Sequence, residues 1–186
     1  LLGVKSHEFS IEPSFEAFLT TLKTSFANLP VDKTEENIQA RCHGIILMAL
    51  SNKTGKILLN TSNKSELAVG YGTLYGDMAG GFAVLKDVPK TLVFQLANYR
   101  NTLSPTIPVA VIDRPPTAEL APNQKDEDSL PPYAILDSIL EMYVEHDKSL
   151  AEIVAAGFAE NIVRQVIAMV EKNEYKRRQA PPGPRI

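Results

Sequence analysis

The sequence predicts an α/β fold with a thin sheet and a helical C-terminal part. Apolar stripes at helical spacing alternate with one short apolar run, Lys56–Asn60, which turn residues bound on both sides and which is typical of an interior parallel strand. The order helix, strand, helix, loop, helix is that of a layered α/β domain. With 186 residues, 44% of them hydrophobic, the chain is long enough for one such domain with a sizeable core.

Three segments precede the strand. The short mixed run Val4–Ile11 is expected to form an edge or core strand. A helix is predicted after Pro13, because apolar residues recur at helical spacing up to Phe26. The next helix starts at Thr34 and stops at 52–55, and we expect it to be buried through Ile38, Cys42, Ile45, Ile46 and Ala49.

Helices dominate the rest of the chain. We expect one from Asn63 through Leu74, one over 90–99, and three apolar stripes after Pro132 that Gly157 interrupts. Residues 103–132 hold seven of the thirteen prolines, so they are expected to form a long irregular loop that is functional or mobile.

Composition excludes several functional classes. The formal net charge of −3 gives no support to bulk binding of nucleic acid or of an anionic membrane. The single cysteine cannot form an internal disulfide, and the three histidines are too scattered for a zinc site. No apolar run approaches the ~20 residues that span a bilayer. These features favour a cytoplasmic protein, and the start Leu1-Leu2, without Met, leads us to expect a piece of a longer chain.

The polar run that follows the predicted strand is a candidate ligand site. In open α/β sheets ligands bind at the carboxyl ends of strands, where backbone N–H groups at a helix start hold anions. Thr61 and Ser62 offer hydroxyls to a nucleotide, and Glu66 offers oxygen ligands to Mg²⁺. The structural alternative is a capping box with Asn63 as N-cap, and the two interpretations are compatible.

The stretch Gly70–Asp77 is rich in glycine but matches neither G-x-G-x-x-G nor a Walker A sequence. Close helix packing followed by a turn therefore explains these glycines better than a phosphate loop. Asp77 is the candidate functional residue, because it lies where the chain leaves a helix.

Isolated basic residues are weaker candidates. Asn37 and Arg41 share a helix face, and Arg41 can bind a carboxylate or phosphate with its planar fork. The alternative for Arg41 is a surface ion pair with an acidic neighbour, Glu36 or Asp32. Lys90 and Lys176 can each neutralise a polyphosphate, although lone lysines are usually solvated.

The segment Leu150–Met169 suggests a rival function, because two short helices around Gly157 resemble a helix-turn-helix. Asn161, Arg164 and Gln165 would then contact DNA, while the neighbouring acidic residues and the net charge count against it. Such hairpins are more often plain packing units.

Five motifs together resemble the synthetase domain of the NAD⁺ synthetases, particularly the glutamine-dependent type, and occur in that family's order. They are TEENIQAR (34–41), TSNKSE (61–66), GYGTLYGDMAGG (70–81), PPTAELAPNQKDEDSLPPY (115–133) and NEYKRRQAPPG (173–183).

The resemblance implies a Rossmann-like ATP-pyrophosphatase fold with an incomplete sheet, and an amide-forming ligase. The carboxylate of deamido-NAD would be adenylated by ATP with Mg²⁺, and ammonia, released from glutamine by an amidase domain, would displace AMP. A homodimer or higher homo-oligomer is implied as well. Another amide-forming enzyme of the same fold group remains a third interpretation.

The resemblance also assigns roles to residues. Asn37, Arg41, Asp77 and Lys176 would hold deamido-NAD. Thr61 would contact ATP, Glu66 would bind the metal and lie at the reacting groups, and Lys90 and Thr117 would face the phosphates, with Glu66, Asp77 and Lys90 as the catalytic set.

The family's serine-glycine-glycine-x-aspartate-serine loop is absent from the 186 residues. We therefore expect residues 1–186 to form a synthetase domain without its pyrophosphate-loop portion, inactive alone, with residues 103–132 as a mobile lid.

Overall fold

The computed structural model describes residues 3–121 and 123–186. Its elements follow in the order α1 (Glu12–Leu22), α2 (Lys33–Thr54), β1 (Leu59–Asn60), α3 (Lys64–Val69), β2 (Phe82–Ala83), α4 (Lys90–Leu103), α5 (Val109–Asp113), the 3₁₀ turn η1 (Asp126–Asp128), α6 (Tyr133–Leu140), the π-helical turn η2 (Glu141–Glu145), α7 (Leu150–Ala155), α8 (Glu160–Lys172) and α9 (Glu174–Arg177).

A small parallel sheet confirms the α/β class. Strands β1 and β2 pair in parallel, with Leu59 opposite Phe82 and Asn60 opposite Ala83, and α3 connects them. Strand β1 covers only the last two residues of the predicted strand Lys56–Asn60. The prediction that this strand is buried in the interior is partly wrong. Asn60 is buried, but Leu59, whose side chain points to the opposite face of the sheet, is 52% exposed.

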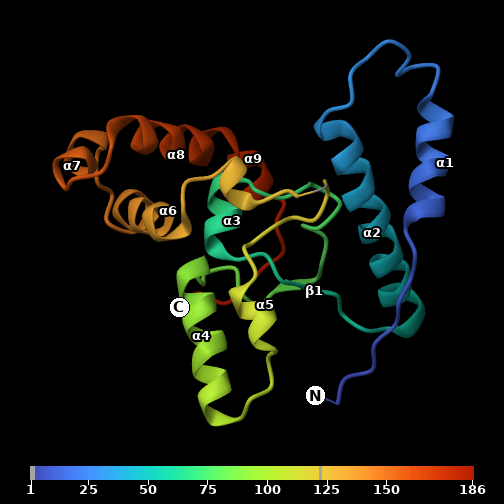
Figure 1. The fold of residues 1–186 in the computed structure, drawn as a ribbon, viewed down its shortest axis with the longest axis horizontal. Coiled ribbons are helices and arrows are strands. Elements are labelled where there is room, and N and C mark those ends of the chain that lie inside the picture. The colour runs from blue at the N-terminus through green and yellow to red at the C-terminus, as the bar shows by residue number, and fades with distance from the viewer. Residues whose placement is uncertain (1–2, 122) are drawn as a thin grey trace.

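The main core lies in the C-terminal third, which is helical as expected. Leu136 and Ile139 of α6 pack against Ile153 of α7 and Val163 and Val166 of α8, and all five are fully buried. Figure 1 shows these helices grouped on one side of α3, with α1 and α2 on the other. The α7–α8 hairpin is thus a packing unit for the core.

Helices α1 and α2 pack on each other as a hairpin. A capping box between Asp32 and Glu35 starts α2, and Gly55, at φ +66°, ends it. The predicted burial of this helix is largely wrong. Cys42 is buried, whereas Ile45 is 56% exposed, because α2 meets the body of the protein only along a narrow strip.

Two further boundaries differ from the sequence-based expectation. The segment 4–11 forms no strand, since residues 4–10 are exposed and no residue of the segment pairs with the sheet. The helix predicted from Asn63 to Leu74 ends at Val69, because Gly70 adopts the left-handed conformation at φ +69°. Within 103–132, α5 and η1 add local order. Among the described helices, none combines the length and apolarity that a membrane span requires.

Candidate functional site

The start of α3 holds Glu66 in place. Asn63 Oδ1 accepts the Glu66 N–H at 3.0 Å, and Glu66 Oε2 accepts the Asn63 N–H at 3.3 Å. The capping box is thereby confirmed. Glu66 Oε1 is left to face Lys90, whose Nζ lies 2.9 Å away, and both side chains are only 19% exposed. The Glu66 carboxylate therefore takes part in both the helix cap with Asn63 and the partly buried ion pair with Lys90.

Lys90 is the first residue of α4, and a hydrogen-bond network fixes it. Its N–H donates to Ser65 Oγ at 2.8 Å, and the Ser65 hydroxyl donates to Asp137 of α6. The N–H and the hydroxyl of Thr91 donate to the same carboxylate at 2.9 and 2.7 Å. The Lys90 ammonium also lies 5.4 Å from the ring centre of Tyr133. Lys90 is thus a positioned charge and not a solvated one.

The turn after α3 places Asp77. The Thr73 N–H donates to Asp77 Oδ1 at 2.6 Å, and the Thr73 hydroxyl donates to Asn37 Oδ1 at 2.8 Å. Buried Asn60, at the end of β1, donates to the Asp77 carbonyl at 2.8 Å. A Cβ on Gly76 would lie 2.9 Å from the carbonyl carbon of Ala40, so only glycine lets the turn approach α2 this closely.

Asp77 is exposed to the hollow beside it, and the surrounding protein removes part of the hydration of its carboxylate. This desolvation raises the pKa of Asp77, and the nearby Glu66 carboxylate raises it further, while the Thr73 N–H and the Lys176 ammonium oppose the shift.

Lys176 reaches the same turn from α9. Its Nζ donates to the carbonyls of Gly70 and Gly72 at 2.8 and 2.7 Å. Burial lowers the pKa of Lys176, and the Asp77 carboxylate counteracts this. A cation with two carbonyl partners and one acidic neighbour therefore lies at the edge of the site.

Two adjoining cavities, each of about 290 Å³, collect most of the candidate residues. The first, here called the Glu66 cavity, is lined by Thr61, Glu66, Asp77, Lys90 and Thr117. The second, the Lys176 hollow, is lined by Asn37, Asp77 and Lys176. Both cavities are lined by Tyr71, Asp77 and Ala118, so they adjoin at these residues.

Arg41 lies outside both cavities. Its Nε donates to the Leu74 carbonyl at 3.2 Å on an exposed face of α2. The alternative ion pair with Glu36 or Asp32 is wrong, since Glu36 pairs with Lys33 instead. Arg41 thus supports the far side of the turn that carries Thr73 and Asp77.

Sequence reasoning missed three residues of the site: Tyr71, Asp126 and Tyr133. Asp126 is 3% exposed, and its Oδ2 accepts the Tyr133 hydroxyl at 2.6 Å. Burial and the neighbouring Asp126 raise the pKa values of Tyr71 and Tyr133 above the usual range for tyrosine. Asp126 was missed because an aspartate in an acidic, proline-rich segment suggests a solvated loop. The signal that could have indicated its burial is Tyr133, seven positions later, whose hydroxyl can donate to a buried carboxylate.

The donor set fits a magnesium ion that is shared with a ligand. No group of three or more His, Cys, Asp or Glu side chains in the described part of the chain is placed to hold a metal by itself. Mg²⁺ commonly binds one or two carboxylates together with substrate phosphates, and Glu66 in its cavity can supply such an oxygen.

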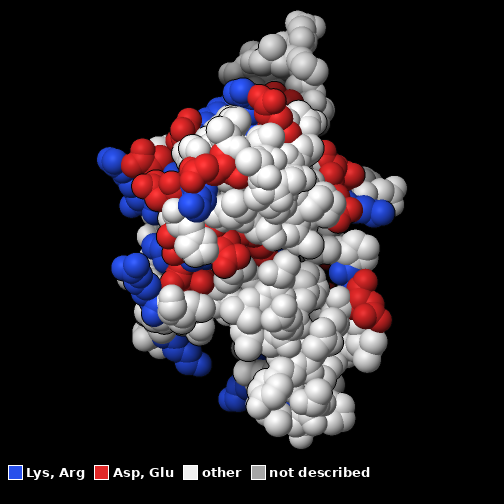
Figure 2. Space-filling model, turned by 90° about the vertical axis from the view of Figure 1, so that its left-hand side faces the viewer, with Lys and Arg blue, Asp and Glu red and all other residues white. Residues whose placement is uncertain are grey.

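The α7–α8 hairpin offers no comparable site. Arg164 pairs with Glu160 at 2.6 Å, and Gln165 donates to the Ser129 carbonyl at 3.4 Å, so two of the three candidate DNA contacts are engaged within the protein. Figure 2 shows Lys and Arg interspersed with Asp and Glu on the face that carries these helices. Nothing supports the DNA-binding alternative.

A polar cavity lined by hydroxyls, an ammonium and carboxylates lies at the end of the parallel strand, and the structural neighbours give this chain an α/β fold of the ATP-pyrophosphatase type. Solved structures agree. An NMN synthetase from Francisella tularensis superposes with a TM-score of 0.77 at 27% identity, covering 95% of this chain and 65% of that one. A glutamine-dependent NAD⁺ synthetase from Acinetobacter baumannii, solved with ADP, is 54% identical with a TM-score of 0.55, covering 94% and 31%.

The family follows from the sequence comparison. The NAD synthase family model matches residues 1–180, and the chain belongs to that family. It is 60% identical to a glutamine-dependent NAD(+) synthetase from Acinetobacter baylyi and 57% identical to one from Xanthomonas campestris, over its whole length. The chain spans only 35% and 34% of those two relatives.

Proposed function

We propose that this chain is the part of an amide-forming ligase in which deamido-NAD is converted to NAD⁺ at the expense of ATP. The observation that carries the proposal is that two cavities adjoin at Asp77, with Thr61, Glu66, Lys90 and Thr117 lining one and Asn37 and Lys176 lining the other. A site for two nucleotides that react with each other needs this adjacency.

The chemistry proceeds in two steps. A carboxylate of deamido-NAD attacks the α-phosphorus of ATP, which forms an acyl adenylate and releases pyrophosphate. Ammonia then attacks the acyl carbon, AMP leaves with the electron pair of the broken C–O bond, and a proton is lost from nitrogen. Adenylation is required because a free carboxylate is a poor acyl donor.

The residues of the Glu66 cavity would hold the ATP side. Thr61, Lys90 and Thr117 line this cavity, so Thr61 would offer a hydroxyl to the nucleotide, and Lys90 and Thr117 would donate hydrogen bonds to phosphate oxygens. Glu66 would hold magnesium, which would supply neutralisation of the triphosphate charge. Residues 103–132 carry Thr117 to the cavity, which supports their role as a lid that excludes water.

The residues of the Lys176 hollow would hold deamido-NAD. Asn37 offers an amide, Lys176 an ammonium, and Asp77 lies at the junction where the acid group would meet ATP. Arg41 would contribute through the backbone of the turn, since its guanidinium donates to Leu74.

Three further parts of the proposal concern the whole protein. The longer relatives are named as glutamine-dependent, which supports ammonia supply by an amidase domain. Exposed Ile45 and Met48 on α2 support a homodimer or higher homo-oligomer. The free, buried Cys42 fits a reducing, cytoplasmic setting.

The test uses the native protein with deamido-NAD, ATP and ammonium. We expect NAD⁺, AMP and pyrophosphate in equal amounts, and exchange of labelled pyrophosphate into ATP only when the acid substrate is present. A second arm offers nicotinate mononucleotide, because a structural neighbour is an NMN synthetase. Preference for the mononucleotide would refute the assignment of deamido-NAD.

The 186-residue chain alone should not complete the reaction, because it lacks the family's serine-glycine-glycine-x-aspartate-serine loop. Robust NAD⁺ formation by the isolated chain would overturn this part of the proposal.

A further inference from the structure

The C-terminus of α3 leaves backbone carbonyls that need partners. Gly70 donates to the Leu67 carbonyl at 3.3 Å, and Tyr71 donates to the Glu66 carbonyl at 2.8 Å, as in a Schellman motif. The next carbonyls along the chain, those of Ala68 and Val69, have no partner within the helix, and the Gly70 carbonyl accepts only the Gly72 N–H, at 2.9 Å, from the backbone.

Side chains of the last helical turn bind these carbonyls one by one. Arg177 Nη1 donates to the Ala68 carbonyl at 2.6 Å, Asn173 Nδ2 to Val69 at 2.9 Å, and Lys176 Nζ to Gly70 at 2.8 Å. We call Asn173, Lys176 and Arg177 the α9 anchor. Asn173 is more than 100 positions from Val69 in sequence, so the contacts join two distant parts of the chain.

The fit around Asn173 is tight. A Cβ on Gly70 would lie 2.2 Å from Asn173 Cγ, so the amide occupies the space that glycine leaves free. Asn173 Nδ2 also donates to the Met169 carbonyl at 2.9 Å, which fixes the amide to the end of α8. The backbone carbonyl of Asn173 accepts the N–H groups of Lys176 and Arg177 at 3.0 and 3.4 Å. The side-chain amide therefore fixes the residue from which the helical turn with both basic residues starts.

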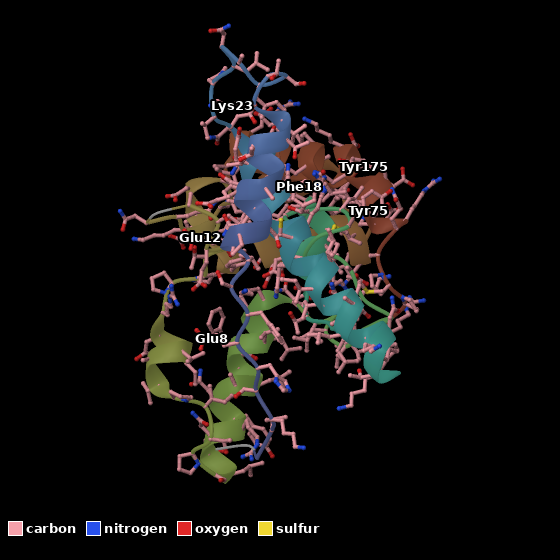
Figure 3. All side chains as sticks on the ribbon, turned by 90° about the vertical axis from the view of Figure 1, so that its right-hand side faces the viewer. Glu8, Glu12, Phe18, Lys23, Tyr75 and Tyr175 are labelled. Carbon is pink, nitrogen blue, oxygen red and sulfur yellow. The ribbon has the colours of Figure 1, made fainter. Side chains whose placement is uncertain are left out.

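The anchored backbone leads directly into the Lys176 hollow. The chain that leaves Gly70 carries Tyr71, Thr73 and Asp77 to it, and Figure 3 shows Tyr75 of this turn and Tyr175 of α9 on the same side of the molecule. The Tyr75 hydroxyl donates to Gln179 at 2.6 Å, a further link between the turn and the segment after α9. Arg177 lines neither of the two cavities.

We propose that Asn173 and Arg177 are positioning residues that hold the Gly70–Asp77 turn and Lys176 in the geometry needed for the acid dinucleotide. They act through the backbone of the turn, without touching the ligand. This role rests on the proposed function, because it assigns the Lys176 hollow to deamido-NAD. It predicts a selective effect, since Lys90 of the Glu66 cavity is held separately by the network around Ser65 and Asp137, and this cavity shares only Tyr71 and Asp77 with the anchored turn.

The experiment compares Arg177→Ala and Asn173→Ala with wild type in the native protein. Hydrogen exchange should become faster over residues 70–78 and stay unchanged in α6. The KM for deamido-NAD should rise roughly tenfold, the factor that one lost hydrogen bond to a charged donor can produce, while the KM for ATP stays within about twofold.

Two matched variants separate positioning from loss of stability. Arg177→Lys keeps one cationic donor for the Ala68 carbonyl, so exchange and KM should return to within about threefold of wild type. Arg100→Ala removes a guanidinium that donates to the Ser104 carbonyl at the end of α4, away from both cavities, and should change neither readout.

Unchanged exchange over 70–78 in Arg177→Ala would overturn the anchor itself. Faster exchange with equal rises in both KM values, or with a loss confined to kcat, would overturn the selective positioning role. A wild-type protein that binds no deamido-NAD would instead refute the proposed function, and the exchange pattern would still decide whether the anchor holds the turn.

Discussion

Replacing Gly70 by alanine should destabilise the protein far more than the same change at Gly55. Both glycines end a helix in the left-handed conformation, with φ of +69° and +66°. A side chain in that conformation costs about 1 kcal/mol at either position. At Gly55 nothing lies within 4 Å of the added Cβ, whereas at Gly70 three atoms of Asn173 lie at 2.2 to 2.5 Å.

The clash at Gly70 adds the loss of hydrogen bonds. Asn173 must move away, and its bonds to the carbonyls of Val69 and Met169 are then lost, at about 1 kcal/mol each. We expect the free energy of unfolding to fall by roughly 3 kcal/mol in Gly70→Ala and by about 1 kcal/mol in Gly55→Ala. Urea unfolding followed by far-UV circular dichroism measures both values.

A double-mutant cycle sharpens the comparison. In Gly70→Ala combined with Asn173→Gly, all three clashing atoms of Asn173, Cβ included, are gone, so the double variant should be more stable than the sum of the two single losses implies. Equal destabilisation by Gly70→Ala and Gly55→Ala, or strict additivity in the cycle, would refute the contact between Gly70 and Asn173 as the cause.

Three more predictions concern single side chains. Because burial raises the pKa of Asp77, the folded state holds its proton more tightly than the unfolded state, and the free energy of unfolding should fall as pH rises from 3.8 through the raised value. Asp77→Asn should flatten that dependence in urea titrations between about pH 3 and pH 7, and an unchanged slope would contradict it. Tyr133→Phe should lower the free energy of unfolding by about 1–3 kcal/mol, since Asp126 Oδ1 has no hydrogen-bond partner among the described residues and Oδ2 would lose the Tyr133 hydroxyl. A melting temperature equal to that of wild type would count against the pair. Ile45→Asp should shift the sedimentation coefficient towards that of a monomer without changing the circular dichroism spectrum, whereas an unaltered assembly would exclude this face of α2 as the subunit contact.

Local signals in the sequence predicted several features correctly. Asn63 and Glu66 stand three apart at the start of a helix, and the capping box that this spacing predicts is present. The stop at 52–55 is also confirmed, because Gly55 ends α2. Caps and turns depend on residues close in sequence, so the sequence alone specifies them.

Burial of α2 was the main failure. A periodic apolar stripe predicts a helix face that packs against other residues, but it does not identify the residues or the subunit that cover that face. Ile45 and Met48 therefore remain exposed in the described chain, while Gly44, which lacks a side chain, is buried against Gly76.

The sequence by itself determined the elements of this protein: the helix caps, the parallel strand that ends at Asn60, and the hydroxyl, amide and carboxylate groups that follow it. Only the tertiary structure decided which of these groups contact each other. Lys90 pairs with Glu66, 24 positions away in sequence, and Arg177 donates to the carbonyl of Ala68, 109 positions away. Contacts at such separations depend on how helices pack around the core, and the packing energy belongs to the whole chain and to no single motif.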